Sequence, residues 1–356
     1  ALVRNRRFVV HYKQSLYVET LLMPSARSIR DYAILTATTG QNRKAVVAEG
    51  QGNRVGSFLK IALNKSSVEN IASEYKSLCL LGGIPFKSTV IPKAWKINEQ
   101  VIRVSNSKLV TARKQPEFGQ AHCRFLWDMY DASFERKYYR QLEISRETRE
   151  RLLRLASNPK LREKGEAREL FYKLKFWEDQ LQTTNPMVAT AVCHGNFTPQ
   201  TVRSGGSSLF VFDWELSRPT MPVLFDLFHY VIQESGLTGN GAVKGLQARL
   251  DLLLNSPIPA WFLRERGLDP TLYLRLYLLY HSSYCLETYL KQEMRYEKGC
   301  QLLSIWSNLL GKVDSKQNEL PNPIPDCKSD FPEAKIIRIE DFGLSSTFPY
   351  LINSRI

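Results

Sequence analysis

The hydrophobic pattern of this chain changes period about a third of the way along, and this change limits the fold more than any other feature. Residues 31–63 form three alternating, β-rich runs, separated by turn-forming stretches at 40–42 and 50–53. From about residue 118 the apolar residues recur with the helical period of 3.6. The pattern predicts a three-stranded antiparallel meander followed by a mainly helical part.

A helix and two further strands are predicted after the meander. Ser66 and Glu69 have the spacing of a capping box, and Gly82 and Gly83 are expected to end the helix. Residues 89–104 read as two more strands. Further helices are predicted at 118–132, 145–156, 160–182, 222–235, 241–255, 258–265, 270–293 and 296–311, with a short β and loop region at 188–213.

The chain has 356 residues, which is too many for one ordinary hydrophobic core. We expect a basic N-terminal extension over 1–30, a β-rich, nucleotide-binding lobe over 31–107, and a helical lobe with the catalytic-type loop over 108–311. The tail over 312–356 contains five prolines and is expected to be irregular.

Positive charge is in excess, with 49 Lys and Arg against 35 Asp and Glu, a net charge of +14. Residues 1–60 contain ten basic and three acidic residues and so hold half of this excess. Such a surplus favours polyanions, anionic membrane surfaces or phosphorylated ligands, and a merely basic soluble protein explains it equally well. Nucleic-acid binding is less favoured, because no helix-turn-helix, zinc-finger or basic-aromatic pattern occurs.

Six scattered cysteines, without a CxxC pair or metal-ligand spacing, indicate reduced thiols. The apolar run 272–290 is interrupted by Arg275, His281 and Glu287, so it predicts a buried helix and not a membrane span. The start of the chain lacks the apolar segment of a secretory signal. We therefore expect a cytoplasmic protein.

Two short motifs carry the candidate chemistry. Residues 194–201 read HGNFTPQT, which joins a His-Gly pair to an amide and a proline-stiffened turn. The second motif, VFDWE, places Asp213 seventeen residues after Asn196. Phosphoryl transfer requires carboxylate or amide ligands for Mg²⁺, cations on the phosphate oxygens and a base near the attacking hydroxyl. The chain supplies candidates for these groups in a suitable order.

The two motifs resemble those of the aminoglycoside phosphotransferase and choline kinase family, whose loop usually reads H-G-D-(F/L)-x-P-x-N and whose metal-binding segment reads (I/V)-D-(W/F)-E. The resemblance covers roughly residues 31–310, and only the two motifs are specific. It implies an α+β, bilobed, protein-kinase-like fold with an antiparallel N-terminal β-lobe that carries one helix and a mainly helical C-lobe. It also implies that ATP and Mg²⁺ bind between the lobes, and that the γ-phosphate passes to a small hydroxyl acceptor such as a sugar, an amino-alcohol or a glycan precursor.

By position in the motifs, His194 is similar to the histidine that anchors the family's catalytic loop, and Asn196 stands in the place of the catalytic aspartate. Thr201 stands where an asparagine helps to bind Mg²⁺, unless Gln200 aligns there with a one-residue gap. Asp213 matches the main Mg²⁺-binding aspartate.

Upstream of the motifs, Lys60 resembles the strand lysine that contacts the α- and β-phosphates, and Glu74 resembles its helix partner. Glu74 lies at helical spacing from Ile71 and Leu78, which places it on the apolar stripe of its helix, where a carboxylate needs a cation. The alternative is a partly exposed glutamate beside a solvated lysine.

The turn over 38–44 joins the first two strands, where this family covers the nucleotide phosphates. Its candidate phosphate-binding groups are the backbone N–H groups together with Gly40, Asn42, Arg43 and Lys44. It lacks a GxGxxG pattern, so an ordinary basic hairpin tip is nearly as good an interpretation.

Two further stretches resemble kinase motifs. Asp226 resembles the aspartate that braces the catalytic loop, and a plain first-turn aspartate of a helix explains it equally well. Residues 340–343 spell EDFG, the protein-kinase metal motif, but they lie beyond the helical part, in the wrong order for the fold.

Two positions depart from the family pattern. Asn196 can orient a hydroxyl but cannot take its proton, and a general base contributes about 10² to 10⁴ in rate. Thr201 is a milder change, because threonine hydroxyls bind Mg²⁺ in P-loop proteins. Three accounts remain open: a nucleotide-binding pseudokinase, a divergent enzyme with another base such as Asp179 or Glu215, and an inactivating Asp-to-Asn exchange that leaves Thr201 unexplained. The competing class is a non-catalytic binding or scaffold protein with a kinase fold.

Overall fold

Two compact units make up the chain. The structure, a computed structural model, describes residues 9–11, 15–17, 31–36, 43–51, 54–106, 117–163, 165–205, 208–237, 242–291 and 306–307. Unit 1 comprises Ala1–Gln115 and His194–Ser217, and unit 2 comprises Pro116–Cys193 and Arg218–Ile356. Both motifs therefore belong to unit 1, and not to the helical unit in which the sequence placed them.

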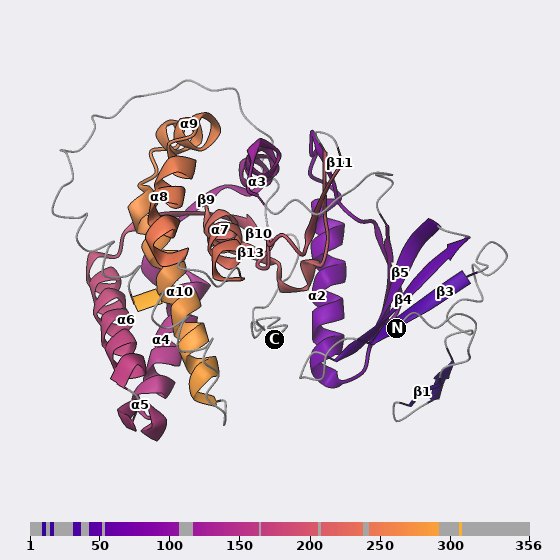
Figure 1. Ribbon diagram of the computed structural model, residues 1–356, viewed down its shortest axis with the longest axis horizontal. Helices are drawn as coiled ribbons and strands as arrows, with labels where there is room; N and C mark the ends of the chain where they lie inside the picture. The colour runs from indigo at the N-terminus through magenta and orange to yellow at the C-terminus, as the bar shows by residue number, and fades with distance from the viewer. Residues whose placement is uncertain are drawn as a thin grey trace. The chain divides into compact units, whose positions relative to one another are not determined.

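A five-stranded antiparallel sheet is the main element of unit 1 (Figure 1). Its order is β3 (Asp31–Thr36), β4 (Lys44–Gln51), β5 (Arg54–Ala62), β8 (Val101–Ser105) and β7 (Ala94–Asn98). The predicted meander over 31–63 is confirmed, since β3 pairs with β4 and β4 with β5. A short hairpin of β1 (Val9–His11) and β2 (Ser15–Tyr17) forms a separate sheet.

One face of the five-stranded sheet forms a hydrophobic core of Ala45, Val47, Leu59, Ile61 and Val101. These residues alternate along their strands with side chains of the other face, as the pleat of a strand requires. The core fixes which strand residues point away from it, and Lys60, between Leu59 and Ile61, is one of them.

The helix α2 (Lys65–Leu81) follows β5 and ends at Gly82, as predicted. The predicted cap is wrong by two residues, because Asn64 and not Ser66 is the N-cap. The Asn64 side chain accepts from the Ser67 N–H at 2.8 Å, and the Ser67 hydroxyl accepts from the Asn64 N–H at 3.0 Å. A serine thus supplies the reciprocal bond expected of Glu69.

A second sheet in unit 1 has three strands, and one of them ends within the VFDWE motif. β12 (Ser208–Val211) pairs antiparallel with β11 (Val202–Gly205) and parallel with β6 (Thr89–Val90). The predicted strand that includes residues 89–95 is therefore divided between two sheets, with Pro92 in the gap, where no ladder hydrogen bond is lost. A 3-10 turn, η3 (Trp214–Leu216), begins three residues after the end of β12.

Unit 2 contains the central strand β10 (Met187–Cys193), which pairs with β9 (Glu135–Tyr138) and β13 (Arg218–Pro222). Its helical elements are α3 (Gln120–Ser133), η2 (Tyr139–Gln141), α4 (Glu143–Ala156), α5 (Pro159–Glu163), α6 (Gly165–Thr184), α7 (Phe225–Leu237), α8 (Ala242–Leu254), α9 (Pro257–Glu265) and α10 (Pro270–Lys291). The predicted helix over 160–182 is thus two helices, α5 and α6.

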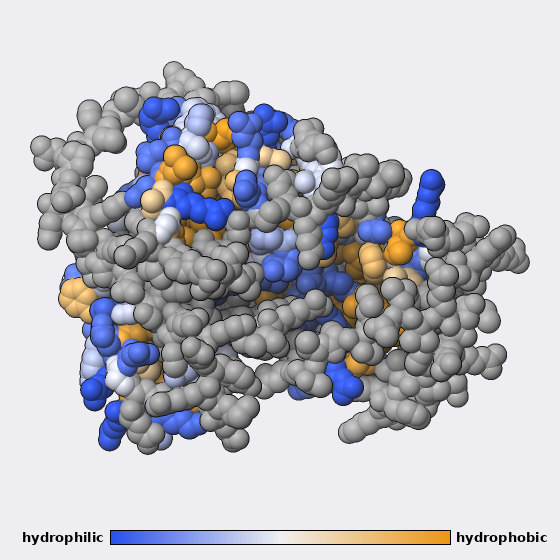
Figure 2. Space-filling model, viewed as in Figure 1, coloured by the Kyte–Doolittle hydropathy of each residue, from blue (hydrophilic) through white to orange (hydrophobic). Residues whose placement is uncertain are grey.

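The apolar run over 272–290 lies in α10, a largely buried helix that packs against α4 and α6, as predicted (Figure 1). Among the described residues, no helix is long and apolar enough to cross a membrane. Figure 2 shows hydrophilic side chains over much of the described surface, with hydrophobic patches between them. Four of the six cysteines lie in the described part, and these four are free thiols.

Candidate functional site

Lys60 is the centre of a buried cluster of charged groups in unit 1. Its Nζ lies 2.6 and 2.7 Å from the two carboxylate oxygens of Glu74 and 2.8 Å from Oδ1 of Asp213. Glu74 is 1% exposed, and Lys60 is 9% exposed. The structure therefore brings together the three residues that the resemblance links to a nucleotide site, although they come from β5, α2 and the turn after β12.

Asp213 has a backbone conformation that residues other than glycine seldom adopt. Its φ of 71° and ψ of 60° place it in the left-handed region. Outside glycine such conformations cost about 1–3 kcal/mol and concentrate at functional sites. The turn that Asp213 makes here directs its own carboxylate and that of Glu215, two residues later, toward the same point.

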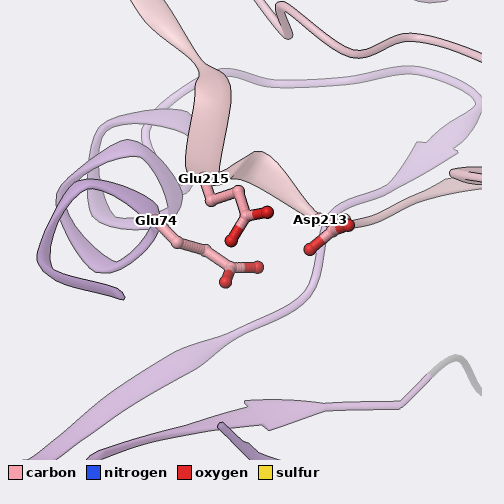
Figure 3. Close-up of side chains that lie close together, drawn as sticks. All are labelled: Glu74, Asp213 and Glu215. Carbon is pink, nitrogen blue, oxygen red and sulfur yellow. The ribbon is translucent and has the colours of Figure 1, made fainter. Parts of the chain in front are cut away.

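Glu215 adds a third carboxylate to the cluster (Figure 3). Oxygen atoms of Glu74, Asp213 and Glu215 all lie within 4.8 Å of one another. Three carboxylates at such distances are suitable ligands for a hard divalent cation such as Mg²⁺, which takes oxygen ligands. Glu74 is already bound through both oxygens to Lys60, so Asp213 and Glu215 are the better placed pair.

A second lysine also reaches these carboxylates. Lys44, the first residue of β4, donates a hydrogen bond to Oε2 of Glu215, and its Nζ lies 3.6 Å from Oδ1 of Asp213. The side chain of Lys44 is 12% exposed. Of the two cradle candidates that the structure describes, Arg43 and Lys44, it places Lys44 in the cluster.

The charges stabilise one another against the cost of burial. Burial alone would lower the pKa of Lys60 and Lys44, but Asp213 raises both above the ordinary lysine value, with help from Glu74 and Glu215. Burial disfavours the charged form of Asp213, yet the two ammonium groups hold its pKa well below the usual range. Burial and the charge of Asp213 raise the pKa of Glu215. The two ammonium groups and the carboxylate of Asp213 therefore hold one another in their charged forms.

The loop over 194–201 is held by its own side chains. His194 is fully buried, its Nε2 lies 3.0 Å from the Phe212 carbonyl, and its Nδ1 accepts from the Asn196 N–H at 3.2 Å. Burial lowers the pKa of His194 to about 4. The ring is therefore neutral at pH 7 and links the loop to the residue before Asp213, which suits an anchor and not a proton acceptor.

Thr201 also serves the internal structure of the loop. Its hydroxyl donates to the Asn196 carbonyl at 2.8 Å and accepts from the Thr198 N–H at 3.1 Å. Its carbonyl accepts from the Phe212 N–H at 3.1 Å. Asn196 itself is half-buried, and its backbone N–H and carbonyl are the groups that hold the loop together.

The remaining candidates lie outside the cluster. Arg43 is exposed and only its carbonyl is used, by the Leu63 N–H at 3.1 Å. Gly40 and Asn42 lie outside the described residues, as does the EDFG stretch over 340–343.

Asp226 and Asp179 belong to unit 2. Asp226, in the first turn of α7, accepts from the thiol of Cys193 at 3.1 Å, directly before the loop begins. Asp179 is paired with Lys175 at 2.7 Å on the exposed surface of α6. Of the two alternative bases that the sequence offered, Glu215 is therefore the one that lies in the cluster.

The sequence predicts Glu215 only as an alternative base and Lys44 only as a candidate phosphate-binding residue. For Glu215 the sequence contains a signal of its role. In VFDWE the residue between Asp213 and Glu215 is a tryptophan, and the buried Trp214 packs against His194 with 4.4 Å between ring centroids. A tryptophan between two acidic residues is expected to be buried, and its burial keeps the residues on both sides of it close to the same site.

Comparison of the sequence with models of known protein families finds no match, and no curated protein sequence matches the chain. Solved structures, in contrast, do match this chain in fold. The streptomycin–ATP ternary complex of APH(2'')-IIa matches with a TM-score of 0.53 and 11% identity, over 81% of this chain and 94% of that one. The ADP-bound aminoglycoside phosphotransferase APH(2'')-Ib gives 0.51 and 11%, over 84% and 97%.

A thermostable mutant of the aminoglycoside phosphotransferase APH(4)-Ia, in complex with ADP and hygromycin B, gives a TM-score of 0.51 and 13% identity over 84% of this chain and 97% of that one. Identities this low establish the fold alone. The predicted fold class is confirmed: the chain is α+β, with an antiparallel sheet in its N-terminal part and a helical C-terminal part, and it has the protein-kinase-like fold of small-molecule phosphotransferases.

Proposed function

We propose that the cluster in unit 1 binds ATP together with Mg²⁺, and that the protein transfers the γ-phosphate slowly to a small hydroxyl acceptor. The observation that carries this proposal is the buried Lys60, whose ammonium is shared by Glu74 and Asp213. Phosphoryl transfer depends mainly on such positioned charges and little on covalent chemistry by the protein.

The carboxylates suit the metal that such a reaction needs. Asp213 and Glu215 offer oxygen ligands close to each other, and Lys44 of the same unit approaches both. A bound Mg²⁺ would neutralise charge on the phosphate oxygens. In this proposal Lys60 binds the phosphates and Glu74 orients Lys60, while Thr201 shapes the loop.

The loop supports slow turnover. His194 is neutral and both of its nitrogens are used, so it cannot accept the proton of the acceptor. The amide of Asn196 can orient a hydroxyl group but leaves its proton to solvent or phosphate. Because the loose transition state needs little base assistance, the reaction is slowed and not abolished.

The ligands are proposed from the fold. Aminoglycoside phosphotransferases with this fold have been solved with ADP or ATP and with streptomycin or hygromycin B. We infer that a nucleotide and a small hydroxylated molecule, such as a sugar, an amino-alcohol or a glycan precursor, are the ligands of this chain. Its net charge of +14 favours an anionic acceptor.

Replacing Asp213 with alanine should remove the response to nucleotide. We expect ATP with Mg²⁺ to raise the unfolding temperature of the unaltered protein, because a ligand that binds only the native state stabilises it. The Asp213→Ala variant should show no such rise. Thermal unfolding with and without ATP and Mg²⁺ measures this, and Glu169→Ala, on the exposed surface of α6, is the control that should respond normally. No rise in the unaltered protein, with ATP or GTP, would refute nucleotide binding.

Replacing Asn196 with aspartate should increase turnover. A carboxylate at this position can accept the hydroxyl proton, and such groups add about 10² to 10⁴ in rate. Phosphate transfer from radiolabelled ATP to a panel of sugars and amino-alcohols measures the change. The single variant His194→Asn should not increase turnover, because the side chain of His194 is buried.

The competing function is that of a non-catalytic, nucleotide-binding scaffold, which the amide at Asn196 favours. The same assay separates the two. An Asn196→Asp variant that binds ATP and still transfers no phosphate to any acceptor or to water would favour the scaffold. A measurable rate that rises with this substitution favours the phosphotransferase.

A further inference from the structure

Lys44 and Lys60 approach the carboxylate cluster from neighbouring strands. In the register of the sheet Lys44 lies opposite Ala62, and Val46 lies opposite Lys60. Directly opposite residues of an antiparallel pair point to the same face, and residues two apart on one strand do so as well. Both lysines therefore extend from one face of the sheet, and their shared direction is a property of the strand pairing.

Lys44 lies against two of the three carboxylates that could hold a metal ion. Its ammonium is hydrogen-bonded to Glu215 and lies 3.6 Å from Oδ1 of Asp213, the same oxygen that Lys60 contacts at 2.8 Å. It thus bridges the two carboxylates that are best placed to hold a metal ion. A divalent ion bound by both would have to displace this ammonium from Glu215.

The loop offers little to a second metal ion. The residue at the position of the family's asparagine is Thr201, whose hydroxyl already donates to the Asn196 carbonyl and accepts from the Thr198 N–H. Lys44 meanwhile supplies a positive charge that a second ion would otherwise supply. With three carboxylates and two ammonium groups, the cluster has one net negative charge when all are ionised.

We propose that Lys44 is a built-in cation that takes the place of a second divalent ion. This inference rests on the function proposed above. Asp213 and Glu215 would hold one divalent ion, and Lys44, once released from Glu215, would bind the phosphate oxygens of the nucleotide. Such a site binds one divalent ion per nucleotide and keeps part of its nucleotide affinity when no divalent ion is present.

The proposal requires that removing the charge of Lys44 has opposite effects on metal and on nucleotide. In Lys44→Met, Glu215 loses its competing cation, so Mn²⁺ alone should bind more tightly. ATP without a divalent ion should bind more weakly by about ten- to a hundredfold, because a charge-assisted hydrogen bond to phosphate is lost. A merely structural lysine would move both affinities in the same direction or neither.

Isothermal titration calorimetry on the full chain measures three quantities: Mn²⁺ alone, ATP in excess EDTA, and Mn²⁺ in the presence of ATP. For the unaltered protein we expect one protein-bound Mn²⁺ per ATP, and electron paramagnetic resonance of Mn²⁺ checks that number. Lys44→Arg should restore ATP binding. Lys65→Met is the matched control, since it removes one positive charge from an exposed site in the same unit and should change neither affinity.

The outcomes distinguish this inference from the function on which it rests. Two Mn²⁺ ions per ATP in the unaltered protein, or a Lys44→Met variant in which both affinities fall, would overturn the role of Lys44 and leave the nucleotide site intact. No binding of ATP or Mn²⁺ by the unaltered protein would overturn both. The stoichiometry is measured without any substitution, so it decides the matter even if Lys44→Met does not fold.

Discussion

Replacing Gly195 with alanine should unfold the catalytic-type loop. Gly195 has a φ of 79°, in the left-handed region that favours glycine, and a Cβ built there would lie 2.1 Å from the carbonyl oxygen of Leu216. The conformation alone costs about 1–3 kcal/mol for another residue. The obstructing atom is backbone and cannot rotate away, so either the loop or η3 must move. We expect the free energy of unfolding to fall by about 3 kcal/mol or more.

The measurement is equilibrium unfolding in urea, followed by thermal unfolding with ATP and Mg²⁺. Because η3 carries Glu215, a displaced η3 should also abolish stabilisation by nucleotide. Gly56→Ala in β5 is the control: the nearest atom to its Cβ is 4.0 Å away, so that variant should be about as stable as the unaltered protein. Equal behaviour of the two variants would show that the loop does not pack against Leu216 as described.

Replacing Lys60 with methionine should have the second large effect. Glu74 would keep both carboxylate oxygens in a buried position without the ammonium that now contacts them at 2.6 and 2.7 Å. Removing one partner of a buried ion pair costs about 3–5 kcal/mol, mostly because a charge is left uncompensated. The free energy of unfolding from urea titrations should fall by this amount.

A second substitution tests the cause. Adding Glu74→Gln to Lys60→Met removes the uncompensated charge, so the double variant should be more stable than Lys60→Met. Lys96→Met is the control, since the Lys96–Glu99 pair is exposed and such pairs contribute less than about 1 kcal/mol. A double variant that loses the sum of both single effects would contradict the ion-pair interpretation.

Features set by local periodicity were predictable from the sequence. The alternation over 31–63 gave the meander, and the helical spacing of Glu74 from Ile71 and Leu78 placed its carboxylate on the buried side of α2. Once Glu74 is buried, elementary electrostatics demands a cation, and Lys60 is near in the chain. The contact between Lys60 and Glu74 could therefore be predicted without knowing any contact between residues far apart in the sequence.

Two kinds of feature were not predictable: those for which neighbouring residues were equally good candidates, and those that depend on contacts between distant parts of the sequence. Asn64 and Ser66 are both good N-cap residues, and Asn64 is the cap because β5 ends two residues before it, at Ala62. The parallel pairing of β6 with β12 joins segments more than a hundred residues apart, which no local pattern records. The position of Glu215 depends on the left-handed turn at Asp213, a conformation that an aspartate rarely adopts.

The chain leaves unit 2 at Cys193 and returns to it at Arg218, and these two residues are paired neighbours on β10 and β13. Asp213 and Glu215 therefore belong to a segment of unit 1, residues 194–217, whose two flanking residues are paired in the β10–β13 sheet of unit 2. A fragment that stops at Gln115 would contain Lys44, Lys60 and Glu74. It would lack Asp213 and Glu215, the carboxylates that form ion pairs with the two lysines. Unit 1 is therefore compact in space but discontinuous in the sequence, and its charged cluster is complete only in a fragment that extends from Lys44 to Glu215.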